Sequence, residues 1–305
     1  MDAVVTGGAG FIGSHVADAL LERGGRVAVI DNLAGGRRDR VPAGAEFHEL
    51  DIRDHDAMQS VFDDLQPAAV FHLAAQADVR ASVEDPCFDA DVNVRGTIAV
   101  LECARSTGAR VVFSSTGGAL YGEAETIPSP EATEPAPMSP YGTSKHGAEL
   151  YLGLFNRLYG TRHMVLRYGN VYGPRQDPHG EAGVVAIFFG KLTSGETPLI
   201  FGDGRQTRDY VYVGDVVAAN MAALAYEGPH QAFNIGTQTE TDVIDLLAES
   251  QRVAGTDVTP EHRPARLGEL DRSCLDIALA RRELGWQPAV PLGEGLAETL
   301  RALHP

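Results

Sequence analysis

Tyr141 and Lys145 are the pair of side chains in this sequence best suited to proton transfer. They stand four residues apart in "SPYGTSKHGAE", and residues at i and i+4 share one face of a helix. A phenol has an ordinary pKa of about 10, so using it as a base at neutral pH requires roughly 4 kcal/mol of preferential stabilisation of the phenolate. A close ammonium supplies much of that stabilisation, and lysine is scarce here, since only Lys145 and Lys191 occur. The spacing therefore predicts a general base on a helix; the alternative is an exposed tyrosine beside a solvated lysine.

A glycine turn near the N-terminus predicts a phosphate site. "TGGAGFIG" places Gly7, Gly10 and Gly13 between a strand-like run and a helical pattern, where glycines let a pyrophosphate approach the amides of a helix N-terminus. The spacing alone is also typical of a plain glycine-rich turn. The second strand, however, ends in Asp31, and a carboxylate there binds ribose hydroxyls and repels a 2′-phosphate, which favours NAD over NADP. Asp51 is either an acceptor for the adenine amino group or a simple cap.

Short apolar runs alternate with helical patterns through the first half of the chain, and this predicts an α/β fold with a doubly wound parallel sheet. The expected strands are 3–7, 26–31, 45–50, 68–74, 110–115, 163–168 and 232–237. A proline-rich surface loop is expected over 123–140, before a helix that starts near Tyr141. After residue 168 the pattern becomes irregular, which predicts a smaller C-terminal α/β domain with helices near 241–254, 276–284 and 293–303.

Composition narrows the classes of function. The formal charge is −17 without a basic run, which disfavours nucleic acid, so an anionic small ligand needs a local group of arginines. No apolar stretch is long enough to span a membrane and no leader pattern is present, so we expect a cytoplasmic protein. Cys87, Cys103 and Cys274 are far apart, which indicates reduced thiols and neither a disulfide framework nor a metal site.

Ordered motifs along nearly the whole chain resemble the extended short-chain dehydrogenase/reductases, and most closely the UDP-sugar 4-epimerases of the UDP-galactose 4-epimerase type. They include "TGGAGFIGSH", "HLAAQADVRASVEDP", "SSTGGALYG", "YGTSK", "LRYGNVYGPRQDP", "RDYVYVGD", "NIGT" and "ARLGEL". The resemblance implies a Rossmann domain that binds NAD, over 1–168 plus about 211–255. It implies a nucleotide-sugar-binding domain over about 169–210 and 256–305. It also implies a homodimer through the helices near 91–105 and 142–159.

The same resemblance assigns roles to individual residues. Thr116 completes a triad with Tyr141 and Lys145 and binds the sugar O4. Asn93 orders the surroundings of the nicotinamide. The positions that the resemblance assigns to the cofactor are Gly7, Gly10, Phe11, Ile12, Gly13, Asp31, Asn32, Asp51, Ile52, Leu73, Ala74, Ala75, Gln76, Asn93, Ser114, Tyr141, Lys145 and Tyr168. Those assigned to the substrate are Asn170, Arg208, Arg266, Glu269 and Ser273.

The implied reaction is the NAD-dependent 4-epimerisation of a UDP-hexose through a 4-keto intermediate, with UDP-glucose and UDP-galactose as the pair. The small Ser273 leaves room for the N-acetylated pair, and UDP-glucuronate is an alternative. An NDP-sugar 4,6-dehydratase shares the first step but needs an acid pair where this chain has Gly117 and Gly118. A non-catalytic NAD sensor is the alternative from another class, although such proteins typically lose the Tyr and Lys pair. Arg175 is either a phosphate ligand or a partner of Asp177.

Overall fold

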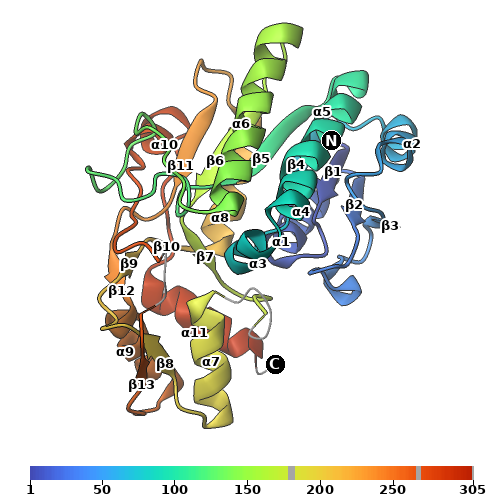
Figure 1. Cartoon of the computed structure of the whole chain (residues 1–305). Coiled ribbons are helices and arrows are strands. Elements are labelled where there is room, and N and C mark those ends of the chain that lie inside the picture. The colour runs from blue at the N-terminus through green and yellow to red at the C-terminus, as the bar shows by residue number, and fades with distance from the viewer. Residues whose placement is uncertain (178–182, 266–268, 304–305) are drawn as a thin grey trace.

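A seven-stranded parallel sheet forms the centre of the computed structural model, which describes residues 1–177, 183–265 and 269–303 (Figure 1). Its strands lie in the order β11-β6-β5-β4-β1-β2-β3. Their bounds are β1 Ala3–Thr6, β2 Val27–Asp31, β3 Glu46–Glu49, β4 Ala69–His72, β5 Arg110–Thr116, β6 Met164–Tyr168 and β11 Ala232–Ile235. All seven predicted strands are confirmed, with ends that differ by a few residues. The strand order reverses on either side of β1, and in open parallel sheets ligands bind in the crevice at such a point.

Helices cover both faces of this sheet because its strands are apolar on both sides. Ala3 and Val5 of β1 pack into one hydrophobic cluster, and Val4 between them packs into the other. The first cluster is covered by α1 (Phe11–Glu22), α8 (Val213–Ala225) and α10 (Ala278–Glu283). The second is covered by α2 (His55–Leu65), α5 (Gly96–Thr107) and α6 (Pro140–Tyr159). The doubly wound α/β fold predicted from the sequence is therefore confirmed.

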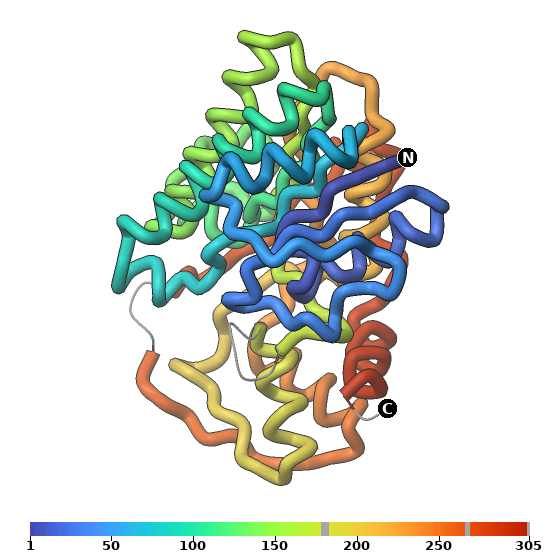
Figure 2. The backbone as a smooth tube through the Cα atoms, turned by 90° about the vertical axis from the view of Figure 1, so that its right-hand side faces the viewer, coloured from blue at the N-terminus to red at the C-terminus, as the bar shows by residue number. Residues whose placement is uncertain are grey.

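A smaller layer lies beyond the large sheet and has a core of its own (Figures 1 and 2). Its helices are α7 (Val184–Ser194), α9 (Val243–Ala254) and α11 (Leu292–Leu303). Three two-stranded ladders accompany them: β7 (Asn170–Tyr172) with β10 (Tyr210–Tyr212), β9 (Thr207–Arg208) with β12 (Thr241–Asp242), and β8 (Leu199–Phe201) with β13 (Glu261–Arg263).

Hydrophobic packing indicates which helices belong to each of the two parts of the chain. Leu246 and Leu247 of α9 pack in the smaller core, whereas Ile277 and Ala280 pack under the large sheet. We therefore propose that α9 belongs with the nucleotide-sugar-binding part and α10 with the NAD-binding part, whereas the resemblance assigned about 211–255 to the NAD-binding part and 256–305 to the other.

The proline-rich stretch at 123–140 contains no helix until α6 begins at Pro140. Its middle is not on the surface, however. Ser129 is buried, its backbone N–H donates to Cys274 O at 2.9 Å, and its carbonyl accepts from Asp276 N at 3.0 Å. Cys87, Cys103 and Cys274 are all free. Among the described residues, no helix combines the length and apolarity that crossing a bilayer requires.

A buried ion pair ties α6 to β6. Arg167 donates through Nη2 to Glu149 Oε2 at 2.7 Å, and their side chains are 10% and 6% exposed. Ser115 adds a hydroxyl donor to Glu149 Oε1 at 2.5 Å, and Arg167 also donates to the Tyr121 hydroxyl at 2.9 Å. Because each charge is compensated by the other, removing one partner costs more than removing both.

Replacing Arg167 with Met leaves the Glu149 carboxylate buried without its counter-charge. We expect Arg167→Met to lower the free energy of unfolding by about 3–5 kcal/mol, measured by urea denaturation. The double variant Arg167→Met with Glu149→Gln should recover most of that loss, because no uncompensated charge remains. Equal losses in the single and double variants would show that burial of an unpaired charge is not the cost.

Candidate active site

Two glycines let the turn after β1 approach neighbouring backbone more closely than any side chain permits. Gly7 has φ +71°, and a Cβ there would lie 2.6 Å from Ala74 N. A Cβ on Gly13 would lie 2.1 Å from Gly7 O. Gly10 stands at the N-cap of α1, where it has no side chain to cap the first helix amides. Uncapped amides at the positive end of a helix suit a phosphate, so the turn fits the pyrophosphate of a dinucleotide.

Asp31 at the end of β2 is buried and fixes the glycine turn. Its carboxylate accepts from Ala9 N at 3.0 Å and from Leu33 N at 2.8 Å. Burial raises the pKa of Asp31, whereas the two backbone donors lower it. A carboxylate that keeps lone pairs beyond these two bonds can still accept from ribose hydroxyls.

Asp51 has a side-chain partner, Arg53, that the sequence analysis does not predict. Arg53 donates to both of its carboxylate oxygens, at 2.9 and 2.8 Å, and Asn32 Nδ2 donates at 3.0 Å. The Arg53 side chain is the main reason that the pKa of Asp51 falls to about 2. Any adenine contact of Asp51 therefore shares the carboxylate with Arg53.

Asn93 fixes the loop that follows β4. It lies in a π-helix, Asp91–Arg95, and is buried. Its Oδ1 accepts from Gln76 N and its Nδ2 donates to Gln76 O, both at 2.9 Å. The same Nδ2 lies 3.1 Å from Ser144 Oγ, next to Lys145 on α6. One amide thus connects the expected cofactor groove with the helix of the proposed base.

Lys145 is buried where α6 meets the end of β5. Its Nζ donates to Ser114 O at 2.9 Å and lies 4.7 Å from the centre of the Phe113 ring. Burial lowers the pKa of Lys145 to about 8, and the charges of Asp89 and Glu149 oppose that shift. The ammonium is therefore held in a largely desolvated place, where its charge would act more strongly on a nearby group than it does in water.

Tyr141 and Thr116 come to the same edge from different elements. Ser139 caps α6 by accepting from Gly142 N at 3.1 Å, which places Tyr141 in the first turn of the helix. A Cβ on Gly142 would lie 2.5 Å from Ala119 O, and Ala119 N donates to Thr116 Oγ1 at 3.1 Å. The tyrosine's segment therefore packs directly against the turn that Thr116 caps.

Of the predicted substrate residues, Asn170 lies beside this turn, and Arg208, Glu269 and Ser273 lie close to one another. Arg208 Nη2 lies 3.6 Å from Glu269 Oε1, and Ser273 N donates to Thr207 O at 3.2 Å. A Cβ on Gly118 would lie 3.3 Å from Asn170 Oδ1, so Asn170 reaches the end of β5. Arg266 lies outside the described residues.

Sequence reasoning missed Asp209, although it stands next to Arg208. Its buried carboxylate accepts from Thr237 N at 2.6 Å, Thr237 Oγ1 at 2.7 Å and Leu275 N at 3.2 Å. It thereby holds two distant segments beside the substrate residues. Asp209 is the middle residue of the motif "RDY", and this motif is the one signal in the sequence that could have indicated its role.

The remaining residues that the resemblance assigns to the cofactor differ in how exposed their side chains are. Tyr168 is a core side chain, with its hydroxyl 2.8 Å from Asn220 Nδ2, and Ile52 is also buried. Gln76 bonds through its side chain to Asp78 N at 2.6 Å. Partly exposed positions at the crevice are Phe11, Ile12, Leu73, Ala74, Ala75 and Ser114.

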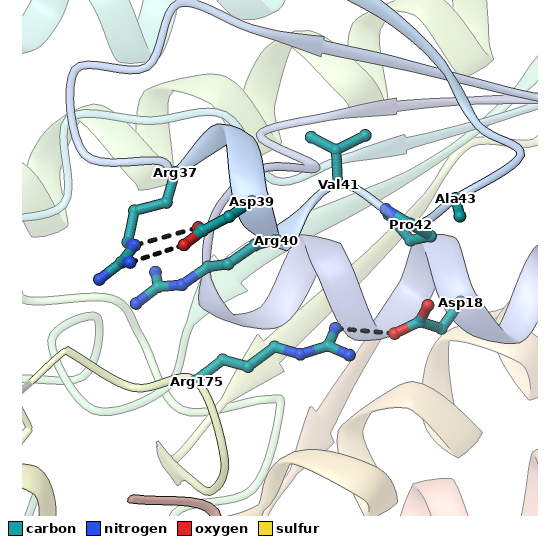
Figure 3. A pocket seen from close by; sticks show the side chains of 8 residues that line it. All are labelled: Asp18, Arg37, Asp39, Arg40, Val41, Pro42, Ala43 and Arg175. Atoms are coloured by element: carbon teal, nitrogen blue, oxygen red, sulfur yellow. Dashed lines mark hydrogen bonds and ion pairs between the residues drawn. The ribbon is translucent and has the colours of Figure 1, made fainter.

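A cavity of about 390 Å³ lies beside the segment that follows Asp31 (Figure 3). Arg37 pairs there with Asp39, and Arg175 Nη1 lies 2.7 Å from Asp18 Oδ2 on α1. Arg175 therefore has a carboxylate partner in Asp18, and its roles as a phosphate ligand or a partner of Asp177 stay predictions.

The chain is similar to known proteins over almost its whole length. The family model described as the NAD dependent epimerase/dehydratase family matches residues 3–236. A UDP-glucose 4-epimerase from Mycolicibacterium smegmatis is 46% identical over 98% of this chain and 97% of its own. The UDP-glucose 4-epimerase of Thermotoga maritima, solved with UDP-glucose, superposes with a TM-score of 0.97 at 48% identity, covering 99% of this chain and 98% of its own. The UDP-glucose 4-epimerase of Thermus thermophilus, solved with NAD, gives a TM-score of 0.92 at 45% identity, again covering 99% of this chain and 98% of its own.

Replacing Lys145 with Met should stabilise the fold. The folded pKa of about 8 lies below the ordinary 10.5, so the charged lysine opposes folding below pH 8 and this penalty disappears as the pH rises toward 10.5. We expect Lys145→Met to raise the free energy of unfolding by roughly 1–3 kcal/mol at pH 7, and by less at pH 9.5. Urea denaturation at both values measures this.

The other lysine provides the control. Lys191 pairs with Glu196 in the smaller layer, so Lys191→Met should show no comparable gain. If Lys145→Met is less stable than the wild type at pH 7, the proposed penalty for burying the ammonium is wrong.

Proposed function

Because the chain belongs to the NAD dependent epimerase/dehydratase family, we propose that it is a UDP-sugar 4-epimerase that interconverts UDP-glucose and UDP-galactose. Its cofactor is NAD. The observation that carries the proposal is the junction of β5 and α6. There Lys145 Nζ bonds to the end of β5, and the first turn of α6, which carries Tyr141, packs against the turn that Thr116 caps.

Tyr141 is the proposed base. Its phenolate, stabilised by the charge of Lys145, takes the proton from the sugar 4-hydroxyl and later returns it to the 4-keto oxygen. Thr116 orients that oxygen through its hydroxyl. When bound, NAD would supply a reversible hydride acceptor for C4 of the sugar, so the overall reaction would have no net change in oxidation state. Inversion at C4 requires the keto sugar to present its other face before the hydride returns.

Arg208 and Arg266 are the proposed anchors for the UDP pyrophosphate, and Asn170 is a proposed donor to the phosphate or the sugar. The Arg208 side chain is only 15% exposed, and a partly buried guanidinium binds phosphate oxygens more strongly than a solvated one. The acid beside it, Glu269, is the proposed acceptor for a ribose hydroxyl of uridine. Firm anchoring at the nucleotide with a loosely held hexose is what rotation of the keto sugar requires.

The 4,6-dehydratase alternative is disfavoured by space as well as by chemistry. A Cβ on Gly117 would lie 2.6 Å from both terminal carbons of Leu275, so an acid at that position would displace this side chain. Leu275 is itself buried and fixed, since its backbone N–H donates to Asp209. The small Ser273 is compatible with the N-acetylated sugar pair, and UDP-glucuronate remains an alternative substrate.

Incubating the purified protein with UDP-galactose and no added cofactor tests the proposal. UDP-glucose as the product would support epimerisation with retained NAD. A 4-keto-6-deoxy sugar would indicate a dehydratase, and no conversion of any UDP-hexose would favour the sensor.

Tyr141→Phe tests the base. It should lower kcat by about 10²–10⁴-fold while the dinucleotide stays bound, because only the ionisable hydroxyl is lost. Tyr151→Phe is the matched control on the outer side of the same helix, and should keep its rate. Near-normal turnover by Tyr141→Phe would contradict the assignment.

A homodimer is also proposed, and a cytoplasmic location stays a prediction. Leu150 and Leu158 on α6 are 60% and 63% exposed, and Phe88 on the neighbouring α4 (Pro86–Ala90) is 47% exposed. Exposed apolar side chains gathered on adjacent helices are typical of a surface that a partner covers. These helices include the range near 142–159 predicted from the resemblance.

Charge placed on this surface should separate the subunits. We expect Leu150→Glu with Leu158→Glu to shift the protein from dimer to monomer in sedimentation velocity, because carboxylates cannot be buried unpaired. Met138→Glu is the control, since Met138 is 63% exposed but precedes the helix. A wild type that sediments as a monomer would refute the dimer.

A further inference from the structure

His72 lies at the end of β4 and forms hydrogen bonds through both ring nitrogens. It is fully buried, with Nδ1 2.7 Å from Thr6 Oγ1 and Nε2 2.9 Å from Thr97 Oγ1. None of these three residues belongs to the proposed catalytic, cofactor or substrate sets. Thr6 is the last residue of β1 and Thr97 lies in α5, so the imidazole of His72 connects the end of this strand with the helix.

The direction of each hydrogen bond follows by elimination. Thr97 donates its one hydroxyl proton to Asn93 O at 2.6 Å, so toward His72 it can only accept, and Nε2 must carry a proton. Burial, with a smaller contribution from the charge of Lys145, lowers the pKa of His72 to about 3, so the ring is neutral and Nδ1 is an acceptor. The Thr6 hydroxyl therefore donates to Nδ1, and Thr6 Oγ1 accepts from Ala74 N at 3.3 Å.

This series of hydrogen bonds connects the glycine turn with the segments of Asn93 and Gln76, on either side of the expected cofactor crevice. Thr6 directly precedes Gly7, the residue that approaches the backbone of Ala74. At the other end, Thr97 holds the carbonyl of Asn93, whose amide fixes both backbone groups of Gln76. Every donor in the series has an acceptor, so substituting one member leaves a buried polar group unsatisfied.

We infer that His72 is a positioning residue, which holds the glycine turn and the Asn93 π-helix at a fixed separation so that both ends of the dinucleotide bind in register. The inference rests on the proposed function, since it concerns the cofactor of that reaction. A buried histidine with satisfied bonds can also serve the fold alone, and the two roles differ in what a substitution changes. Loss of positioning lowers cofactor retention and kcat, whereas loss of a core contact lowers stability only.

Thr97→Val is the decisive variant, because it keeps the shape of the side chain and removes the hydroxyl that joins His72 to Asn93. We expect NAD to dissociate about ten-fold faster from the purified holoenzyme, and kcat to fall by about ten-fold with the KM for UDP-galactose changed less than about three-fold. Thr97→Ser keeps the hydroxyl and should restore both values. His72→Gln, which retains a donor toward Thr97, should fall between the wild type and Thr97→Val.

Thr299→Val is the matched control. Thr299 is equally buried and donates to Gly295 O at 2.7 Å, the same bond to the residue four positions earlier, but on α11. It should lower the melting temperature as much as Thr97→Val does and leave NAD retention and kcat unchanged. If Thr97→Val behaves like Thr299→Val in all three measurements, His72 is a structural residue and the inference is overturned. Because NAD retention is measured without substrate, it tests the inference even if the proposed sugar is wrong.

Discussion

The burial of one ammonium group, that of Lys145, determines much of the surrounding structure. A charge removed from water needs acceptors and counter-charges, and it has Ser114 O, the face of Phe113 and the carboxylates of Asp89 and Glu149 nearby. Glu149 is itself buried and therefore requires Arg167 on β6. The helix that carries the proposed base is thus fixed to the sheet by a buried ion pair, one member of which, Glu149, also acts on the ammonium of Lys145.

The cofactor crevice is held by close backbone contacts and buried polar bonds. Gly7 approaches Ala74 so closely that a methyl group would overlap its amide, and Asp31 holds the turn from the other side. Asn93 then fixes the backbone of Gln76 through two bonds. These contacts leave little freedom for the loops that would touch the dinucleotide, which suits an enzyme that keeps its cofactor through the catalytic cycle.

The segments around the predicted substrate residue Arg208 are held together by the buried carboxylate of Asp209. The Asp209 carboxylate accepts from the backbone N–H groups of Thr237 and Leu275, so it holds both segments close to Arg208, the proposed pyrophosphate anchor. Leu275 then occupies the space beside Gly117. The same carboxylate therefore fixes Leu275, which fills the space that a side chain at residue 117 would need.

The sequence by itself determined the seven strands of the large sheet and the shared helix face of Tyr141 and Lys145, because both follow from local periodicity. It did not determine side-chain partners. Arg53 takes both oxygens of Asp51, Tyr168 lies in the core, and His72 joins residues 66 positions before it and 25 after it. Such pairs depend on strand order and register. These are decided only when distant segments pack together, because a side chain's position in the chain does not specify which buried polar group it must satisfy.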